Sequence, residues 1–409
     1  MRERETMPQW GSGVLEQLST HLVGRQVPQY STALEHLDDS LQEAIGGRRI
    51  LVLGAAGFIA RQTLSLLLPY RPSHVGLVDL SENGLAELIR GLRVSDAIPV
   101  GTTVVPWLAD IGSPNFTRLL HSMGPVDRVF NFAAVKHVRS ERDIPSLLRM
   151  IEVNLVGIHS SALAVENHAP GTPHFVVSTD KAADPSNFMG ASKRAMEIGL
   201  SFILAPTTSA RFANVAFSSG SLLESWLLRL GERQPLAVPQ STWRYFVTPQ
   251  EAGQLCLAAS MAPSHSVVIP HFATPDLILL EDALRSTLEF LGFKPIRVAG
   301  LSEARARLAE GALDQRCYPY VVTSLDTAGE KSAEQLLGAD ELADPWKPGL
   351  DVMPMTGSGE GPASLIAWLK EVISSPAIDV NVDEVGRRLA EVVPNFTHQA
   401  GTFQLDDRA

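Results

Sequence analysis

The chain is poor in the residues that build disulfide-linked or metal-stapled folds. Its 409 residues include two cysteines, Cys256 and Cys317, and eleven histidines. The cysteines form no CxxC pair, and neither residue type shows the spacing of metal ligands. The sequence therefore argues against a disulfide framework and a zinc site. We expect no metal, a reducing compartment, and two cysteines that fill the core or its margin.

A surplus of basic residues is also missing. The 34 Lys and Arg against 45 Asp and Glu give a formal net charge of −11, which argues against a nucleic-acid surface and favours a metabolite as partner. The charged start of the chain is followed by no apolar segment, and no run approaches the roughly 18 apolar residues of a membrane span. These absences predict a cytoplasmic protein without nucleic-acid or membrane partners.

Hydrophobic residues are plentiful, at 45% of the chain, enough for one large core and a smaller lobe. Apolar strands alternate with helical stretches through the first half of the chain. Strands are expected at residues 49–54, 74–79, 103–108, 127–132, 174–179 and 210–215. Strands separated by helices at this spacing predict an α/β fold with a doubly wound parallel sheet.

Four segments are predicted. Residues 1–47 form an N-terminal helical extension, and residues 48–217 form a dinucleotide-binding Rossmann-like domain. The alternation then becomes irregular and rich in proline, so residues 218–345 are assigned to a smaller C-terminal substrate-binding lobe interleaved with sheet elements. Residues 346–409 are expected to be a linker and a helical extension. Helices outside the main domain are expected at 13–22, 32–45, 363–374 and 383–392.

A loop of small residues, Gly54-Ala-Ala-Gly57, joins the first strand to the next helix. Small residues let the backbone approach a pyrophosphate, and a helix amino terminus presents free N–H groups to it. Such loops also occur for purely steric reasons. However, Asp79 closes the second strand, where a carboxylate can accept hydrogen bonds from an adenosine ribose. This position favours NAD over NADP, although Arg90 and Arg93 could reach a 2′-phosphate.

Further candidates follow the third and fourth strands. Asp110 and Ile111 can hold the adenine, and the alanines after Phe132 leave room for the cofactor. Because these signals occur in the expected chain order, they predict binding of a nicotinamide dinucleotide. The residues assigned to this site are Gly54, Ala56, Gly57, Phe58, Ile59, Asp79, Asp110, Ile111, Phe132, Ala133, Ala134, Lys136, Asn154, Ser178 and Lys193.

The stretch STDKAADPSNFMGASK, from Ser178 to Lys193, is the most specific motif of the chain. With shorter matches, it resembles the nucleotide-sugar 4,6-dehydratases of bacterial polysaccharide synthesis. These are extended short-chain dehydrogenases that act on nucleotide-linked N-acetylglucosamine. The resemblance spans residues 48 to 345. The shorter matches are Gly54-Ala-Ala-Gly57, Ala133-Ala-Val-Lys-His-Val138, Asn154-Leu-Val-Gly157, Arg211-Phe-Ala-Asn214, Arg244-Tyr-Phe-Val-Thr248 and Gly329-Glu-Lys331.

The resemblance implies a reaction that oxidises C4 with NAD(P)+, eliminates water across C5 and C6, and returns the hydride to C6. It implies Asp180 as the acid at the departing C6 hydroxyl and Lys181 as the base at C5. Lys193 is expected to bind the nicotinamide ribose, and Thr179 or Ser178 to contact the sugar near O4. The alternative interpretation of the Asp–Lys pair is an exposed, solvated turn.

Met189 departs from the usual pattern of short-chain dehydrogenases, which carry Tyr four residues before the active-site Lys. A thioether cannot accept the proton of the C4 hydroxyl. Asp180, Lys193 through a water, or a more distant tyrosine such as Tyr245 or Tyr318 has to accept it. One branch of the family also has Met here, and the chain is assigned to that branch. A non-catalytic relative is the alternative.

Substrate residues are assigned by the same resemblance. Arg244 is expected to hold the diphosphate, because a planar guanidinium can bind phosphate oxygens bidentately. A surface salt bridge is the alternative role. The other residues expected at the substrate are Lys136, His137, Asn214, Ser221, Glu330 and Lys331.

The leading hypothesis is therefore a 4,6-dehydratase of UDP- or GDP-linked N-acetylglucosamine, with the carrier and the configuration at C5 left open. The alternatives are a 4-epimerase or oxidoreductase on the same substrates and a non-catalytic dinucleotide-binding scaffold. The expected partner is a nucleotide sugar, and a homo-oligomer is expected for this fold.

Overall fold

The computed structural model describes residues 12–136, 141, 143–324, 333, 335–356 and 361–398. The chain divides into two compact units, each made of three stretches of sequence. The Rossmann unit comprises Gln29–Phe212, Gln250–His271 and Gln335–Ala409, and the small unit comprises Met1–Pro28, Ala213–Pro249 and Phe272–Glu334. The units cut across the four predicted segments, because the two ends of the chain belong to different units.

A nine-stranded sheet forms the centre of the Rossmann unit, in the order β14-β15-β10-β6-β5-β4-β1-β2-β3. The strands from β10 to β3 are parallel, and β15 and β14 continue the sheet in antiparallel fashion. The order reverses between β1 and β4, so the predicted α/β fold with a doubly wound sheet is confirmed. The strands are β1 (Arg49–Leu53), β2 (His74–Asp79), β3 (Thr103–Leu108), β4 (Arg128–Asn131), β5 (His174–Val177), β6 (Thr207–Ala210), β10 (Ser266–Pro270), β14 (Asp344–Lys347) and β15 (Leu350–Pro354).

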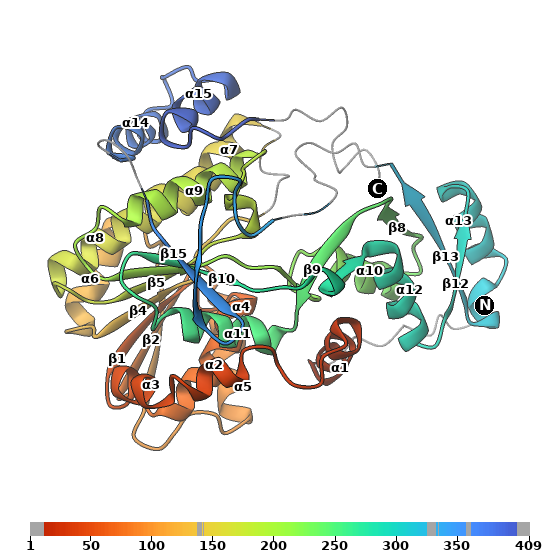
Figure 1. Ribbon diagram of the computed structural model, residues 1–409, viewed down its shortest axis with the longest axis horizontal. Coiled ribbons are helices and arrows are strands. Elements are labelled where there is room, and N and C mark those ends of the chain that lie inside the picture. The colour runs from red at the N-terminus through yellow and green to blue at the C-terminus, as the bar shows by residue number, and fades with distance from the viewer. Residues whose placement is uncertain are drawn as a thin grey trace. The chain divides into compact units, whose positions relative to one another are not determined.

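Helices cover both faces of this sheet (Figure 1). On one face α6, α8 and α9 pack in the main core together with α14 and α15. On the other face α11 packs on α4, where Gly253 approaches the backbone of Gln62. The helices are α2 (Ser31–Glu35), α3 (Asp38–Ile45), α4 (Phe58–Leu67), α5 (Glu82–Val94), α6 (Pro114–Met123), α7 (Ile144–Ile151), α8 (Ile158–His168), α9 (Phe188–Leu200), α11 (Pro249–Ala259), α14 (Ala363–Ser374) and α15 (Val382–Val392).

A π-helical turn, Glu152–Gly157, joins α7 and α8 into one continuous helix. Within the described part of the chain, this is the one helix whose length and hydropathy would suffice to cross a membrane, although the sequence was expected to contain no such run. However, 56% of its most apolar window is buried, and its residues Leu155 and Ile158 lie in the main core of the Rossmann unit. Core helices of globular proteins commonly have these properties.

Two elements near the chain ends differ from expectation. The helix expected at residues 32–45 is interrupted at His36–Leu37 and forms α2 and α3. The linker expected from residue 346 is instead a β-hairpin, in which β14 and β15 pair across Pro348–Gly349. Gly349 has a φ of +75°, a conformation that suits a tight turn and favours glycine. The hairpin extends the central sheet, so its strands belong to the Rossmann unit.

The sixth strand also differs. It was expected at residues 210–215 and is found at Thr207–Ala210 as β6, with the short β7 (Asn214–Val215) in the small unit. The sequence of β6 is polar, but its hydroxyl groups are satisfied, because Thr207 donates to the carbonyl of Leu200 at the end of α9 and Ser209 donates to that of Val176 on β5. Satisfied hydroxyls permit a buried polar strand that hydrophobic patterning does not identify.

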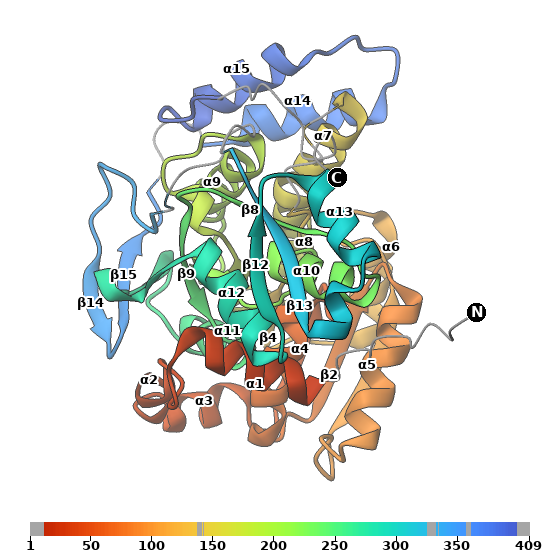
Figure 2. The ribbon, with the colours of Figure 1, turned by 90° about the vertical axis from the view of Figure 1, so that its right-hand side faces the viewer.

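The small unit contains two three-stranded sheets, β11-β9-β7 and β12-β13-β8. Figure 2 shows β8, β12 and β13 of the second sheet. Its core includes Leu18 and Leu22 of the N-terminal helix α1, together with Trp226 and Leu284. Residues 12–23 are thus an integral part of the small unit. Its elements are α1 (Ser12–Val23), α10 (Leu222–Gly231), α12 (Leu280–Phe290), α13 (Leu301–Ala309), β7 (Asn214–Val215), β8 (Leu236–Pro239), β9 (Trp243–Val247), β11 (Leu277–Leu279), β12 (Lys294–Val298) and β13 (Cys317–Thr323).

We predict that Leu18→Ala lowers the free energy of unfolding by about 2–5 kcal/mol, because it leaves a cavity in this core. Leu228→Ala is the matched control, since Leu228 on α10 is 63% exposed and should change stability by no more than about 0.5 kcal/mol. Urea denaturation followed by circular dichroism measures both. Equal stability of Leu18→Ala and Leu228→Ala would show that α1 is not part of the core.

Candidate active site

The loop expected to bind the cofactor begins at a close approach between two strand ends. Gly54, directly after β1, has a φ of +68°, and a Cβ placed there would lie 2.7 Å from the backbone nitrogen of Ala133 and 2.8 Å from the carbonyl carbon of Phe132. Only glycine fits such a conformation and such a contact. The loop after β1 therefore touches the chain after β4, at the point where the strand order reverses.

The same loop is fixed by Asp79 at the end of β2. One carboxylate oxygen accepts a hydrogen bond from the N–H of Ala56 at 2.9 Å, and the other accepts one from Ser81 at 2.9 Å. Each oxygen keeps a further lone pair for a ligand. Gly57 begins α4, and no side chain caps the helix, so the N–H groups of its first turn, which includes Phe58 and Ile59, have no side-chain acceptor.

The residues after β3 and β4 lie at the same edge of the sheet. Asp110 accepts a hydrogen bond from Gly112 at 2.9 Å and pairs with Arg149 at 3.2 Å, and Ile111 beside it is buried. Ala134 is exposed and Ala133 half-buried. The parallel sheet thus brings together residues that were expected to bind the cofactor, at the edge where doubly wound folds bind ligands.

Asn154 has a different environment from the one expected. It is fully buried in the π-helical turn, where its amide exchanges two hydrogen bonds of 2.9 Å with the backbone of Val135 and donates a third to Ser192 at 3.2 Å. Asn154 therefore holds the loop after β4 against α9 with its whole side-chain amide. Lys136, the next residue of that loop, is exposed.

Asp180 and Lys181 occupy the short helical turn that follows β5. The carboxylate Oδ1 of Asp180 accepts from the hydroxyl of Thr179 at 2.8 Å and from the backbone N–H of Lys181 at 2.9 Å, and it lies 3.5 Å from the Lys181 ammonium. The side chain of Asp180 is 7% exposed and that of Lys181 25%. A solvated surface turn, the alternative interpretation of this pair, does not describe a carboxylate this deeply buried.

Met189 and Lys193 lie on the first turns of α9, and both are buried. Met189 packs in the main core. The Lys193 ammonium donates to the carbonyl of Val177, at the end of β5, at 3.0 Å. Burial lowers the pKa of Lys193 to about 8, although the Glu197 carboxylate opposes the shift. Lys193 is therefore held at the same strand end as Asp180.

Two carboxylates that the sequence analysis did not single out also contact this region. Glu141 accepts a hydrogen bond from the backbone N–H of Met189 at 3.0 Å, and burial raises the pKa of its carboxyl group, opposed by the N–H groups of Met189 and Phe188. Glu197 accepts a hydrogen bond from the Ser178 hydroxyl at 2.6 Å, so this hydroxyl points to α9. The position of Glu197 one helical turn after Lys193 was a usable signal, because residues four apart share a helix face.

Three of the expected substrate residues, Arg244, Asn214 and Ser221, belong to the small unit, whereas Lys136 belongs to the Rossmann unit. Arg244 on β9 is buried and donates to the carbonyl of Trp243 at 2.8 Å. Asn214 lies on the neighbouring strand β7, with its amide 3.5 Å from the carbonyl of Tyr245. Ser221 caps α10. His137, Glu330 and Lys331 lie outside the described residues.

Tyr318 is unsuited to the proton-accepting role for which it was a candidate. It is fully buried in the core of the small unit and donates its hydroxyl to the carbonyl of Gln234 at 2.8 Å, and burial raises its pKa. Tyr245, the other candidate, stacks on Phe272 with ring centroids 4.8 Å apart. Cys256 and Cys317 are free thiols, and the described residues contain no cluster of three or more His, Cys, Asp or Glu that could hold a metal.

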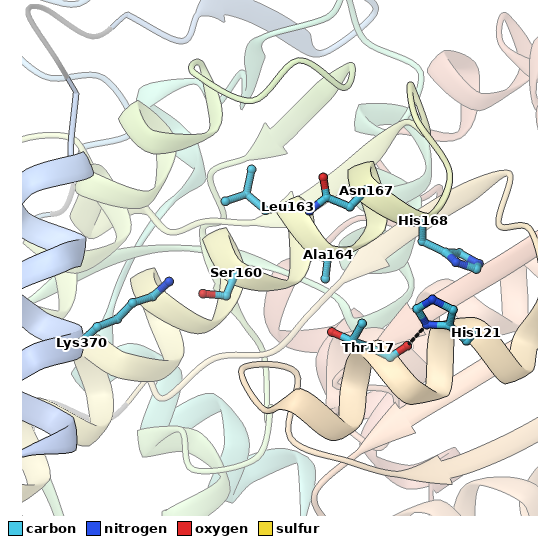
Figure 3. Close-up of a pocket in the computed structure, with 8 residues that line it drawn as sticks. All are labelled: Thr117, His121, Ser160, Leu163, Ala164, Asn167, His168 and Lys370. Atoms are coloured by element: carbon cyan, nitrogen blue, oxygen red, sulfur yellow. Dashed lines mark hydrogen bonds between the residues drawn. The ribbon is translucent and has the colours of Figure 1, made fainter.

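A separate pocket lies on the outside of α6, α8 and α14 (Figure 3). His121 and His168 meet there edge to face, and each binds a backbone carbonyl, His121 that of Thr117 and His168 that of Gly124. None of the residues expected at the cofactor or the substrate lines this pocket. The predicted chemistry is concentrated at the sheet edge instead.

Comparison with known proteins agrees with this geometry. The family model described as polysaccharide biosynthesis protein matches residues 50–345. The chain belongs to this family. One relative, the capsular polysaccharide biosynthesis protein CapD of Staphylococcus aureus, is 28% identical over 294 residues, which cover 67% of this chain and 47% of CapD. A UDP-glucose 4-epimerase of Rickettsia massiliae is 26% identical over 286 residues, 66% of this chain and 76% of the epimerase.

The chain spans about half the length of the first curated relatives that it matches, 47% of CapD and 45% of EpsC from Bacillus subtilis. Among solved structures, Pen from Bacillus thuringiensis has a TM-score of 0.61 at 21% identity, covering 82% of this chain and 99% of Pen. The UDP-Glc/GlcNAc 4-epimerase of Campylobacter jejuni has a TM-score of 0.51 at 16% identity, covering 71% and 90%. These two structures support the α/β fold with a mostly parallel central sheet.

We predict that Lys193 makes the stability of the protein depend on pH. Its pKa is about 8 in the folded chain and about 10.4 in an unfolded one, so between these values the unfolded state binds a proton that the folded state lacks. The Lys193 contribution to the free energy of unfolding therefore rises with pH across this interval. Urea denaturation should show a steeper rise for the wild type than for Lys193→Met. Lys370→Met, at an exposed lysine of α14, should keep the wild-type slope, and an unchanged slope in Lys193→Met would contradict the prediction.

Proposed function

We propose that the protein is a nicotinamide-dependent 4,6-dehydratase of a nucleotide-linked N-acetylglucosamine. The observation that carries the proposal is the position of Asp180 and Lys181, which lie at the carboxyl end of β5 with a buried lysine, Lys193, bound to the same strand end. An acid and a base fixed beside a cofactor edge are what elimination of water requires. Membership of the polysaccharide biosynthesis family supports this substrate class.

The edge around Gly54 fits a dinucleotide. A Cβ at Gly54 would fill the space where the loop meets Ala133, and the first turn of α4 offers N–H groups that no side chain caps to a pyrophosphate. Asp79 retains acceptor capacity for ribose hydroxyls and would repel a 2′-phosphate, which favours NAD over NADP. A nicotinamide bound at this edge would supply the hydride chemistry of the reaction, oxidation at C4 and reduction at C6.

Asp180 is proposed as the acid and Lys181 as the base. All hydrogen bonds that the Asp180 carboxylate makes among the described residues use Oδ1, so Oδ2 is the oxygen that can contact the C6 hydroxyl. The partly exposed Lys181 can remove the C5 proton once its ammonium is neutral. Thr179, whose hydroxyl donates to Asp180, would keep the carboxylate in place near the sugar.

The proton of the C4 hydroxyl needs another acceptor, because Met189 has none. The buried Asp180 carboxylate, or Lys193 through a water, is proposed for this step. A 4-epimerase also oxidises C4 and needs the same proton acceptor, so Met189 does not separate the two reactions. The epimerase is still a candidate, since proteins named UDP-glucose 4-epimerase are 26% identical to this chain.

The remaining expectations are part of the proposal. A UDP- or GDP-linked sugar is proposed to contact seven residues: Arg244, Asn214, Ser221, Lys136, His137, Glu330 and Lys331. The protein is proposed to act in the cytoplasm as a homo-oligomer, without nucleic-acid or membrane partners. A non-catalytic scaffold is less consistent with a buried acid–lysine pair, which serves no evident structural need.

We expect the purified protein, incubated with NAD+ and UDP- or GDP-N-acetylglucosamine, to give a product lighter by one water in mass spectrometry. Epimerisation would leave the mass unchanged. Asp180→Asn and Lys181→Ala should lower the rate about 10²-fold or more, since each removes a proton-transfer group. Lys370→Ala, which removes an exposed lysine on α14 of the same unit, is the control and should keep wild-type activity. Full activity of Lys181→Ala would refute its role as base.

We also expect Gly54→Ala to abolish binding of NADH, measured by its fluorescence. The added methyl group meets the backbone after β4 at a positive φ, so the loop has to move away from the pyrophosphate. Gly91→Ala is the matched control, because nothing lies within 4 Å of its added methyl group, and alanine suits the interior of α5. Undiminished NADH affinity in Gly54→Ala would place the cofactor elsewhere.

A further inference from the structure

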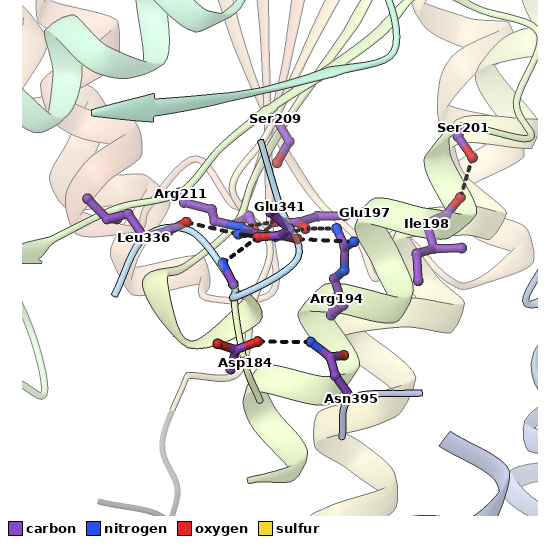
Figure 4. Close-up of polar contacts among 12 residues, drawn as sticks. Asp184, Arg194, Glu197, Ile198, Ser201, Ser209, Arg211, Leu336, Glu341 and Asn395 are labelled. Atoms are coloured by element: carbon purple, nitrogen blue, oxygen red, sulfur yellow. Dashed lines mark hydrogen bonds and ion pairs between the residues drawn. The ribbon is translucent and has the colours of Figure 1, made fainter. Parts of the chain in front are cut away.

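Arg194, Glu197, Arg211 and Glu341 form a cluster of charged side chains beside α9 (Figure 4). Arg211, just after β6, and Glu197, on α9, are both fully buried. The guanidinium donates from Nε to Oε1 of Glu197 at 3.0 Å and from Nη2 to Oε2 at 2.8 Å. This bidentate arrangement fixes the relative position of the two side chains.

Two further groups complete the cluster. Arg211 also binds both carboxylate oxygens of Glu341 and the carbonyl of Leu336. Arg194 bridges the two acids, at 3.0 Å from Glu197 and 3.1 Å from Glu341. Two arginines thus face two glutamates, and the buried charge is balanced.

The cluster reaches the proposed active site through Ser178. Glu197 accepts the Ser178 hydroxyl at 2.6 Å, two residues before Asp180. One turn earlier on α9, Lys193 donates to the carbonyl of Val177 at 3.0 Å. Helix α9 is therefore attached to the end of β5 at two consecutive residues, one attachment made by Lys193 and the other by Glu197.

We propose that Glu197 is a positioning residue, which holds Ser178 and α9 through Arg211 and so fixes Asp180 and Lys193 for catalysis. The inference rests on the proposed function for its effect on turnover. Arg211 also binds Glu341 and the carbonyl of Leu336, so the segment around Leu336 is connected to Glu197 through the same guanidinium. The catalytic strand end thus depends on a stretch of chain far away in the sequence.

Glu197 also acts on Lys193 electrostatically. Its carboxylate raises the pKa of the Lys193 ammonium, against the larger lowering by burial. The other charged groups in this region are the partners of Glu197 and its neighbours, Arg194, Arg211 and Glu341, and the pair Asp180–Lys181 after β5. Neutralising Glu197 removes an attraction and leaves both arginines less compensated, so the pKa of Lys193 should fall further below its wild-type value.

The test compares Glu197→Gln with the wild type in turnover and in the titration of Lys193. The chain has seven lysines, so lysine labelled with 13C gives resolvable NMR signals, and Lys193→Met identifies the relevant one. We expect Glu197→Gln to lower kcat about ten- to a hundredfold with little change in KM, as misplaced catalytic groups do. The Lys193 titration should move down by about one unit. An unchanged kcat or an unmoved titration overturns the proposal.

Two further variants separate the role of Glu197 from a general effect of charge loss and from a failure to fold. Glu303→Gln loses the same charge from the exposed pair with Arg307 and should leave kcat and the Lys193 titration as in the wild type. Ser178→Ala keeps both buried charges and removes only the hydroxyl. If Glu197→Gln does not fold, Ser178→Ala decides: we expect about tenfold lower kcat with an unchanged melting temperature, and wild-type kcat overturns the proposal.

Failure of the proposed function has a different signature. A wild-type protein that removes no water from either nucleotide sugar contradicts the dehydratase. The NMR titration needs no turnover, so it still decides whether Glu197 sets the environment of Lys193.

Discussion

The central constraint of the Rossmann unit is a buried guanidinium that has to be compensated. Arg211 has no contact with solvent, and an unpaired charge in that position would be strongly destabilising. Its compensation comes from Glu197 on α9 and from Glu341, which stands 130 residues further along the chain. Strand β6, helix α9 and the segment before β14 are thereby held in one arrangement, and the end of β5 is held with them through Ser178.

Much of this architecture follows from sequence pattern alone. Strands β2 and β3 and helix α14 lie at the predicted residues, because parallel strands and core helices form apolar runs between turn residues. The tight loop at Gly54 and the turn that holds Asp180 and Lys181 were singled out by motif. The predicted proximity of these groups follows from the sheet, since the carboxyl ends of parallel strands share one edge.

The remaining features depend on contacts that no local pattern records. The polar strand β6 is stabilised by hydroxyl groups that bind carbonyls of α9 and β5. The hairpin of β14 and β15 resembles a linker in composition, but it pairs with β10, some 80 residues earlier in the chain. The ion pair between Arg211 and Glu341 and the role of Asn154 as a backbone clamp are likewise properties of tertiary structure.

The N-terminal segment shows that the region matched by the family model does not coincide with a folding unit. The family model begins at residue 50, yet α1 supplies Leu18 and Leu22 to the small unit, while Gln29 is already bound to Glu251 and His271 of the Rossmann unit. A protein trimmed to the matched region would expose the face of α12 on which α1 packs. Dissection of this chain into independently folding pieces therefore has to follow spatial grouping, and no single cut separates the two units.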